Sequence, residues 1–242
     1  MKQLTVALAC AACLAACTPE ATENSGEAVD AQPPSADTMR PDANDPAGGE
    51  GAMPADWTFR PDRMDHPHAV GADTTADVFF ANMTPGWHVT TGPAGIFSHS
   101  GSTASGSYAA SSDIHLFDPG DRREAFGLFF GGTGLDGDNQ AYTYFLIRQG
   151  GQFLVKERTG TDTRTLLDWT SNDAIASFDA ASGSSVMNSL MIDVGADTVS
   201  FSVNDVRVGW LPTDSVRTGG LVGFRVNHGL NLHISSLEVA QR

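Results

Sequence analysis

Hydrophobic and polar positions alternate with a period of two along most of the second half of the chain. The alternation is clear in TVSFSV, residues 198–203, where every second residue is apolar. Segments of this kind, bounded by glycine, asparagine or aspartate, are typical of antiparallel strands with one buried face. The same pattern predicts further strands at residues 108–117, 126–130, 141–148, 152–158, 189–194, 206–210, 221–226, 230–234 and 237–239.

Short turn sequences separate these predicted strands. Gly150-Gly151 supplies two residues that adopt positive φ angles easily, which predicts a tight hairpin between residues 141–148 and 152–158. Only residues 172–178 favour a helix, and that helix would be short. Many short strands with closely spaced turns predict an all-β fold, an antiparallel two-sheet sandwich or barrel.

The first seventeen residues have the pattern of a targeting segment. Lys2 is followed by a short apolar run, and small residues then precede Cys17. The run is shorter than the roughly 20 residues that a membrane-spanning helix needs. It is typical of a bacterial lipoprotein signal, so we expect residues 1–16 to be removed and Cys17 to be lipidated. A secretory signal cut elsewhere is the alternative. Thr18, in place of aspartate, favours anchoring in the outer membrane of the cell envelope.

Residues 17–56 contain mainly alanine, proline, glycine, small polar residues and acidic residues. They include nine acidic residues against a single basic residue, Arg40. Such a stretch cannot bury enough apolar surface to offset the entropy that it loses on ordering. We therefore expect a disordered acidic linker between the lipid anchor and a folded domain.

Residues 57–242 have the size of a single all-β domain. They contain twelve basic and twenty acidic residues, a formal net charge of −8, which argues against nonspecific binding to nucleic acid or to anionic lipid head groups. All three cysteines of the chain, at positions 10, 13 and 17, precede this domain. The composition therefore excludes a cysteine nucleophile, a cysteine-ligated zinc and an iron–sulfur cluster from the mature domain.

Several of the predicted strands resemble those of a known family. Residues 188–194, 199–205 and 220–224 resemble the last strands of a concanavalin A-like jelly roll, and residues 107–116 and 125–130 resemble its middle strands. Within this fold, the chain is similar to the laminin-G-like domain of the 3-keto-disaccharide hydrolase type. The resemblance implies a two-sheet jelly roll. It also implies either a carbohydrate ligand or a glycoside-processing reaction made easier by a neighbouring ketone.

Two predicted strands offer candidate ligand-binding residues. Because side chains alternate along a strand, Tyr142, Tyr144 and Arg148 share one face, and Arg225 and Asn227 share a face of another strand. Aromatic rings can stack on the C–H faces of sugars, while fixed polar groups bind the hydroxyls. If these faces belong to the concave side of the sandwich, they form a binding site for a glycan or oligosaccharide. An ordinary solvated sheet face is the alternative.

Glycoside hydrolysis usually requires two carboxylates on either side of the bond that breaks. The domain has three glutamates, Glu124, Glu157 and Glu238, and none falls in the E-x-D-x-x-E motif of jelly-roll glucanases. This absence argues against retaining glucanase chemistry. The candidate catalytic residues, chosen by chemical type alone, are Glu124, Asp113 and His115.

The loop before residue 141 contains a possible cation site. Residues 132–137 fit G-x-G-x-x-G by letter, but a strand is predicted next, where dinucleotide binding needs a helix. Asp136, Asp138 and Asn139 supply oxygen ligands of the kind that calcium prefers, which makes calcium the one cofactor that the sequence favours. A plain acidic turn is the alternative.

Three functions follow from these observations and stay open at this point. The first is a lipid-anchored envelope protein whose jelly roll binds a carbohydrate. The second is a glycoside-processing enzyme of the 3-keto-disaccharide hydrolase type. The third is a protein-interaction module of the envelope that has no sugar ligand.

Overall fold

A computed structural model of the chain describes residues 53–63 and 78–242. The predicted signal, the lipidation site Cys17 and nearly all of the predicted linker lie outside these residues. Among the described residues, no helix is long and apolar enough to cross a membrane.

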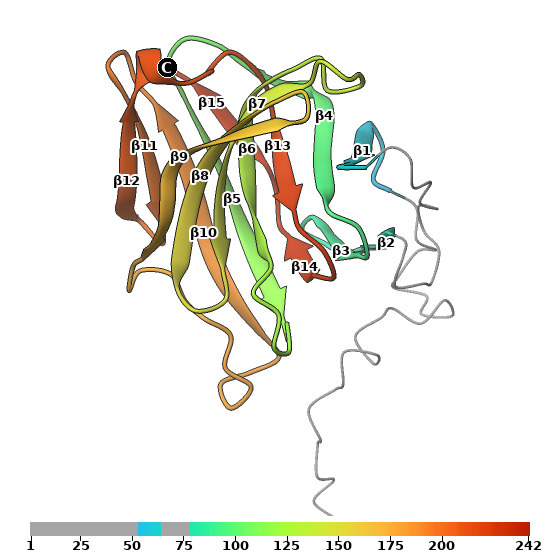
Figure 1. The fold of residues 1–242 in the computed structure, drawn as a ribbon. Coiled ribbons are helices and arrows are strands. Elements are labelled where there is room, and N and C mark those ends of the chain that lie inside the picture. Colours follow the sequence, from blue (N-terminus) through green and yellow to red (C-terminus); the bar gives the residue numbers. More distant parts are fainter. Residues whose placement is uncertain (1–52, 64–77) are drawn as a thin grey trace, which may run out of the picture. The chain divides into compact units, whose positions relative to one another are not determined.

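The described part of the chain folds into two antiparallel sheets, shown in Figure 1. The seven-stranded sheet has the order β1 (Trp57–Pro61), β4 (Gly95–Ala104), β13 (Gly220–Val226), β6 (Ala125–Thr133), β7 (Ala141–Arg148), β8 (Gln152–Thr159), β9 (Asp162–Ser171). The eight-stranded sheet has the order β12 (Val206–Pro212), β11 (Thr198–Val203), β10 (Ser185–Val194), β5 (Tyr108–Phe117), β14 (Asn231–Ile234), β3 (Trp87–Thr91), β2 (Val78–Asn82), with β15 (Glu238–Gln241) paired to β5. The prediction of an all-β, antiparallel two-sheet jelly roll is confirmed.

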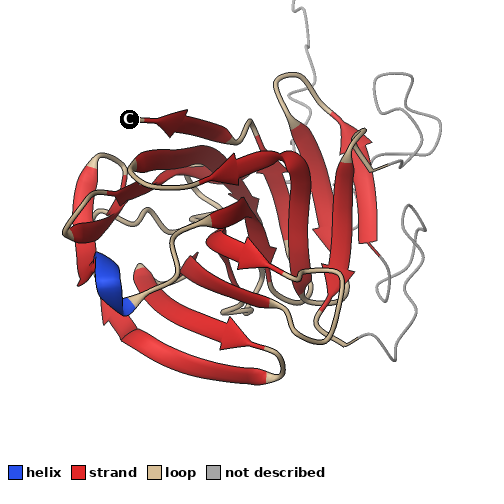
Figure 2. Cartoon of the chain, turned by 90° about the horizontal axis from the view of Figure 1, so that it is seen from above, coloured by secondary structure: helices blue, strands red, loops and turns tan. Residues whose placement is uncertain are grey.

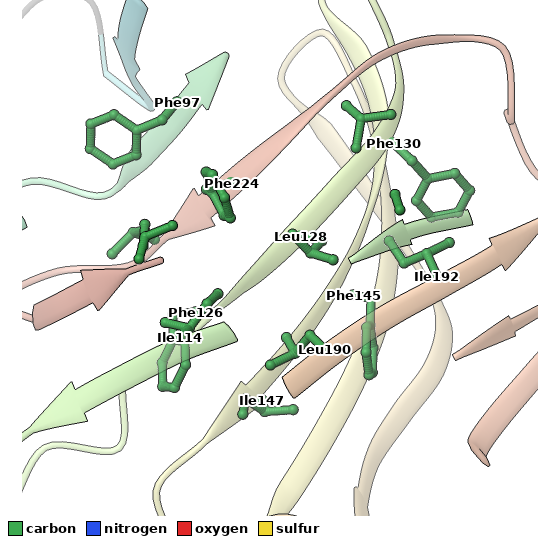
Figure 3. Close-up of a cluster of buried hydrophobic side chains, with 14 of the residues drawn as sticks. Phe97, Ile114, Phe126, Leu128, Phe130, Phe145, Ile147, Leu190, Ile192 and Phe224 are labelled. Carbon is green, nitrogen blue, oxygen red and sulfur yellow. The ribbon is translucent and has the colours of Figure 1, made fainter. Parts of the chain in front are cut away.

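Alternating apolar residues of the two sheets meet in one core between them. Figure 3 shows this contact: Phe126, Leu128 and Phe130 of β6 lie with Phe145 of β7, and Leu190 of β10 comes from the opposite sheet. All five side chains are almost fully buried. Because strand side chains alternate, burying every second residue of β6 and β7 against this core turns the others to the outer face of the sheet.

The hairpin predicted between β7 and β8 is confirmed. Gly150 and Gly151 have φ angles of 92° and 68°, a region that side chains with a Cβ avoid. The turn between β11 and β12 uses Asn204 and Asp205 in the same left-handed region, with φ angles of 48° and 65°. Both turns match the right-handed twist of the strands that they join.

The short helix expected at residues 172–178 is wrong. The structure has turns there, and side chains from other elements bind backbone groups that a helix would use. The amide of Ala176 donates to Asn188 Oδ1 at 2.9 Å, and the amide of Phe178 donates to Gln149 Oε1 at 2.8 Å. These tertiary hydrogen bonds replace the local bonds of a helix, so the weak helical preference of the segment is overridden.

The seven-stranded sheet curls strongly, and its outer face is the concave one. Five inter-strand steps separate β1 from β8, and at about 4.8 Å a step a flat sheet would place them about 24 Å apart. Asp62 follows β1 directly, and its amide still bonds the carbonyl of Ala94 at the sheet edge. Its carboxylate nevertheless lies 3.1 Å from the guanidinium of Arg158 on β8. Only a sheet that bends around this contact allows it, and Figure 2 shows the strands following such a curve.

Candidate functional site

Four of the five residues predicted to bind a ligand lie on the concave face, the outer face of the seven-stranded sheet. Tyr142 and Tyr144 belong to a second apolar cluster on this face, apart from the core between the sheets. Arg148 follows them at the same alternation on β7, and Arg225 lies between two core residues of β13 and so points outward. Asn227 comes just after β13, where its amide donates to the carbonyl of Ala125.

A buried ion-pair network occupies the middle of this face. Arg225 donates from Nη1 and Nη2 to the two carboxylate oxygens of Asp62, each at 2.5 Å, and Arg158 donates to Asp62 Oδ1 at 3.1 Å. The Arg225 side chain is only 9% exposed. Burial alone would raise the pKa of Asp62, but the hydrogen bonds and charge of Arg225, with the charge of Arg158, hold it below its ordinary value. Asp62 is therefore a carboxylate fixed between two guanidinium groups.

Two tyrosine rings form an apolar floor next to the network. The rings of Tyr142 and Tyr144 lie 5.7 Å apart, and the guanidinium carbon of Arg225 lies 5.9 Å from the Tyr144 ring centre. Burial raises the pKa of Tyr144 to about 12, so its hydroxyl stays protonated at neutral pH. Phe129 packs against Tyr142 at 5.4 Å between ring centres, and Gly223 leaves room for the Phe129 ring. The tyrosines are buried, so they support the face more than they contact solvent.

Arg148 lies in a second, partly exposed group at the β7–β9 side of the face. Its guanidinium carbon is 3.8 Å from the centre of the Trp169 ring, a cation–π contact. Arg148 Nε and Nη2 donate to Gln152 Oε1 at 3.0 and 2.6 Å, and Gln152 Nε2 donates to Ser171 Oγ at 3.3 Å. We call these four residues the Trp169 platform. It combines a large aromatic ring with polar groups whose orientation is fixed by their mutual contacts.

The structure therefore separates Arg148 from Tyr142, Tyr144 and Arg225, although all share one face. It also adds Asp62, Arg158 and Trp169, which sequence reasoning missed. The β7–β8 hairpin contained a signal for Arg158, because its register pairs that residue with Tyr142. No local pattern connects Asp62 with the sheet that it binds.

The three candidate catalytic residues do not come together. Asp113 and His115 lie on β5, on the outer face of the eight-stranded sheet, where the His115 ring lies 5.6 Å from His233. Glu124 directly precedes β6 of the other sheet. Asp113 accepts a hydrogen bond from Ser189, and both line a polar groove of about 300 Å³.

The calcium ligands predicted in the β6–β7 loop are exposed side chains. Asp136, Asp138 and Asn139 all face solvent, and the carbonyl of Gly137 in the same loop accepts a hydrogen bond from Arg60 Nη2 at 3.1 Å. Nowhere in residues 53–63 and 78–242 do three histidine, cysteine or acidic side chains lie close enough to hold a metal ion together. The geometry of the loop gives the calcium hypothesis no support.

Two curled antiparallel sheets around one core define a concanavalin A-like jelly roll, and the comparisons with solved structures agree. The fold is similar to the carbohydrate-binding module CBM66 from Bacillus subtilis, with a TM-score of 0.54 and 14% identity over 77% of this chain and 96% of that one. It is similar to a β-glucanase of Bacillus licheniformis, with a TM-score of 0.53 and 11% identity over 81% and 97% of the two chains.

A third similar structure is a Bacillus subtilis protein of unknown function with a galectin-like fold. Its TM-score is 0.52, and the identity is 11% over 77% of this chain and 89% of that one. No family model and no curated protein matches the sequence. At these identities the similarity establishes the fold alone, and the function has to be argued from the side chains of the site.

Proposed function

We propose that this domain binds a carbohydrate on its concave face and that Cys17 anchors it to the cell envelope through a lipid. The observation that supports carbohydrate binding is the Trp169 platform, where a partly exposed indole lies beside a guanidinium, an amide and a hydroxyl. Known proteins of the same fold include a carbohydrate-binding module and a glucanase, which adds support.

The two groups of residues have different tasks in this proposal. The indole of Trp169 stacks on the C–H face of a sugar ring, while Arg148 and Gln152 bind its hydroxyls. The buried network of Asp62, Arg158 and Arg225 links β13 and β8 and so holds the same face in shape beside the platform. A site that is held rigid before the ligand arrives loses less entropy on binding, which favours affinity.

A glycan-array screen of the full-length protein in detergent tests the proposal, with two matched tryptophan variants. Trp169→Ala removes the indole of the platform, and we expect the affinity for the selected glycan to fall about tenfold or more. Trp210→Ala is the control, because Trp210 is 53% exposed on β12 of the other sheet. Failure to bind any glycan, or an equal loss in both variants, would contradict the proposal.

The lipid anchor has a separate test in cells. Cys17→Ser removes the thiol that would carry the lipid. We expect the unchanged protein in the membrane fraction and in the detergent phase after phase separation, and the variant in the aqueous phase. Recovery of both proteins in the detergent phase would contradict lipidation at this residue.

Nothing in the described geometry favours the glycoside-processing alternative. Asp113 and His115 lie on β5 of one sheet, and Glu124 precedes β6 of the other, so no shared site of the three carries this alternative. The proposed function is accordingly binding.

A further inference from the structure

The concave face is positively charged in a domain that is negatively charged overall. The inter-strand register places five of the twelve basic residues of residues 57–242 on this face, opposite Ile96, Ala125, Tyr142 and Tyr144. They are Arg60, Arg148, Lys156, Arg158 and Arg225. The carboxylate of Asp62 lies between two of these basic residues, Arg158 and Arg225. The domain as a whole has a net charge of −8. The positive charge is therefore concentrated locally.

Little of this charge is neutralised within the face. Arg158 and Arg225 share the single carboxylate of Asp62, which leaves one positive charge in excess. The carbonyl of Gly137 accepts the hydrogen bond of Arg60, and the buried Arg60 Nε has no partner. Arg60 therefore has no negatively charged partner in these contacts.

The Trp169 platform is cationic for the same reason. Arg148 contacts the amide of Gln152 and the indole of Trp169, both uncharged. Asp136 and Asp138 lie outside the face, in the β6–β7 loop. Asp168 is an acidic residue beside the platform, because a bulge of β9 places it with Trp169 opposite Leu154, and its carboxylate accepts a hydrogen bond from the Trp169 amide at 2.8 Å. Even with Asp62 and Asp168 counted, the five basic residues leave the face positively charged.

We infer that the ligand is an anionic saccharide, with carboxylate or sulfate groups that lie along Arg148, Lys156 and Arg158. This inference rests on the proposed function and names the chemical class of its ligand. A guanidinium donates two parallel hydrogen bonds to a planar carboxylate, and Arg225 with Asp62 shows that pairing on this same face. All three of the proposed contact residues are partly exposed, so a ligand can reach them.

The test compares charged and uncharged forms of one saccharide. Binding of the full-length protein in detergent is measured with oligogalacturonate, with its fully methyl-esterified form, with dextran sulfate and with dextran. We expect a charged form to bind at least about tenfold more tightly than its neutral counterpart. The difference should shrink as NaCl rises from about 0.1 M to about 1 M, because the Debye length falls from about 10 to about 3 Å.

Charge-removing variants locate the site. Lys156→Gln should weaken binding of the charged saccharide about tenfold, while binding of a neutral one changes little. Arg148→Gln should weaken binding of both saccharides, because Arg148 also binds sugar hydroxyls, and it should weaken binding of the charged one more. Arg148→Lys retains the charge but loses the paired donors, so it should recover only part of the affinity. Arg207→Gln is the control, because Arg207 is exposed on β12 of the other sheet. Circular dichroism melts verify that each variant is folded.

The outcomes separate this inference from the proposed function. Equal affinity for charged and methyl-esterified oligosaccharides would overturn the anionic ligand and leave carbohydrate binding intact. Binding to no saccharide would overturn both. An equal loss in Arg207→Gln would show general attraction to the protein surface and overturn the site. Binding of dextran sulfate without oligogalacturonate would support anionic recognition with sulfate as the charged group.

Discussion

The outer faces of the two sheets differ in chemistry, although their inner faces share one core. The concave face of the seven-stranded sheet combines aromatic rings with arginine and lysine. The outer face of the eight-stranded sheet has a polar groove of about 300 Å³, lined mainly by serine hydroxyls and carboxylates: Ser111, Asp113, Ser189, Ser202, Asp205, Ser236 and Glu238. Basic side chains lie beside aromatic rings on the concave face, and carboxylates lie beside serine hydroxyls in the groove of the other sheet.

This difference shows where the fold is free to vary. Inner-face positions have to be apolar because the two sheets bury each other, so they give little information about function. Outer-face positions have no such requirement. The buried ion-pair network on the concave face therefore calls for an explanation beyond stability. Well-packed apolar residues in its place would often give the folded state the same stability.

The test with the largest expected effect removes the carboxylate of Asp62, which pairs with Arg158 and Arg225 on the concave face. Asp62→Asn leaves Arg225 buried without its counter-charge, and we expect the free energy of unfolding to fall by about 3–5 kcal/mol. Asp113→Asn is the matched change on the other face, where the carboxylate is exposed, and it should cost within about 0.5 kcal/mol. Urea titration measures both. Similar losses in the two variants would mean that the faces do not differ in this respect.

A second test concerns how tightly the concave face is packed. A Cβ at Gly223 would overlap the carbonyl oxygen of Phe97 and lie 2.6 Å from a ring carbon of Phe129. We expect Gly223→Ala to lower the free energy of unfolding by about 1–3 kcal/mol through overpacking. Gly219→Ala is the control, because nothing lies within 4 Å of a Cβ built there. An unchanged urea midpoint for Gly223→Ala would show that both the Phe97 backbone and the Phe129 ring can move aside.

A third test uses the histidines of the eight-stranded sheet. His88 is buried, and its pKa is lowered from 6.5 to about 4, mainly by the loss of solvation. The hydrogen bond to Asn231 raises this pKa somewhat, and the charge of His233 lowers it. The folded protein therefore binds this proton less readily than the unfolded chain. The stabilisation is complete above pH 6.5 and is lost as the pH falls toward 4, by about 2 kcal/mol at pH 5.

Variants separate this contribution from other acid effects. His88→Gln should reduce the difference in urea midpoint between pH 7.5 and pH 5, because the glutamine does not titrate. His228→Gln changes an exposed histidine and should retain most of that difference. If His88→Gln kept the full pH dependence, another group would be responsible for it.

The sequence predicts the strands well where their inner face is buried in the core. The alternation in residues 141–148 and 198–203 matched β7 and β11 residue for residue, and it separated Tyr142 and Tyr144 from Phe145 correctly. The pattern was weaker in β9, whose residues are mostly exposed, so that strand and Trp169 were not predicted. Period-two reasoning needs a buried face, and an edge strand such as β9 offers little of one.

The ion-pair network lies beyond that kind of reasoning. Asp62 and Arg225 are 163 positions apart, and their contact depends on the curl of a sheet. Curvature arises from twist and bulges summed over several strands, such as the register shift between Leu221 and Gly223 on β13. A single sequence states which face a residue occupies, but not how far that face bends.

The smallest expected effect comes from an ion pair on the eight-stranded sheet, and it sharpens the contrast with Asp62. Arg242 Nη1 donates to both carboxylate oxygens of Asp193, at 2.7 and 2.9 Å, yet their side chains are 53% and 35% exposed. Water and salt screen such a pair, so we expect Asp193→Asn to cost no more than about 1 kcal/mol and the loss to shrink as salt rises. A loss close to that of Asp62→Asn would show that the geometry of a pair, and not its burial, decides its contribution in this fold.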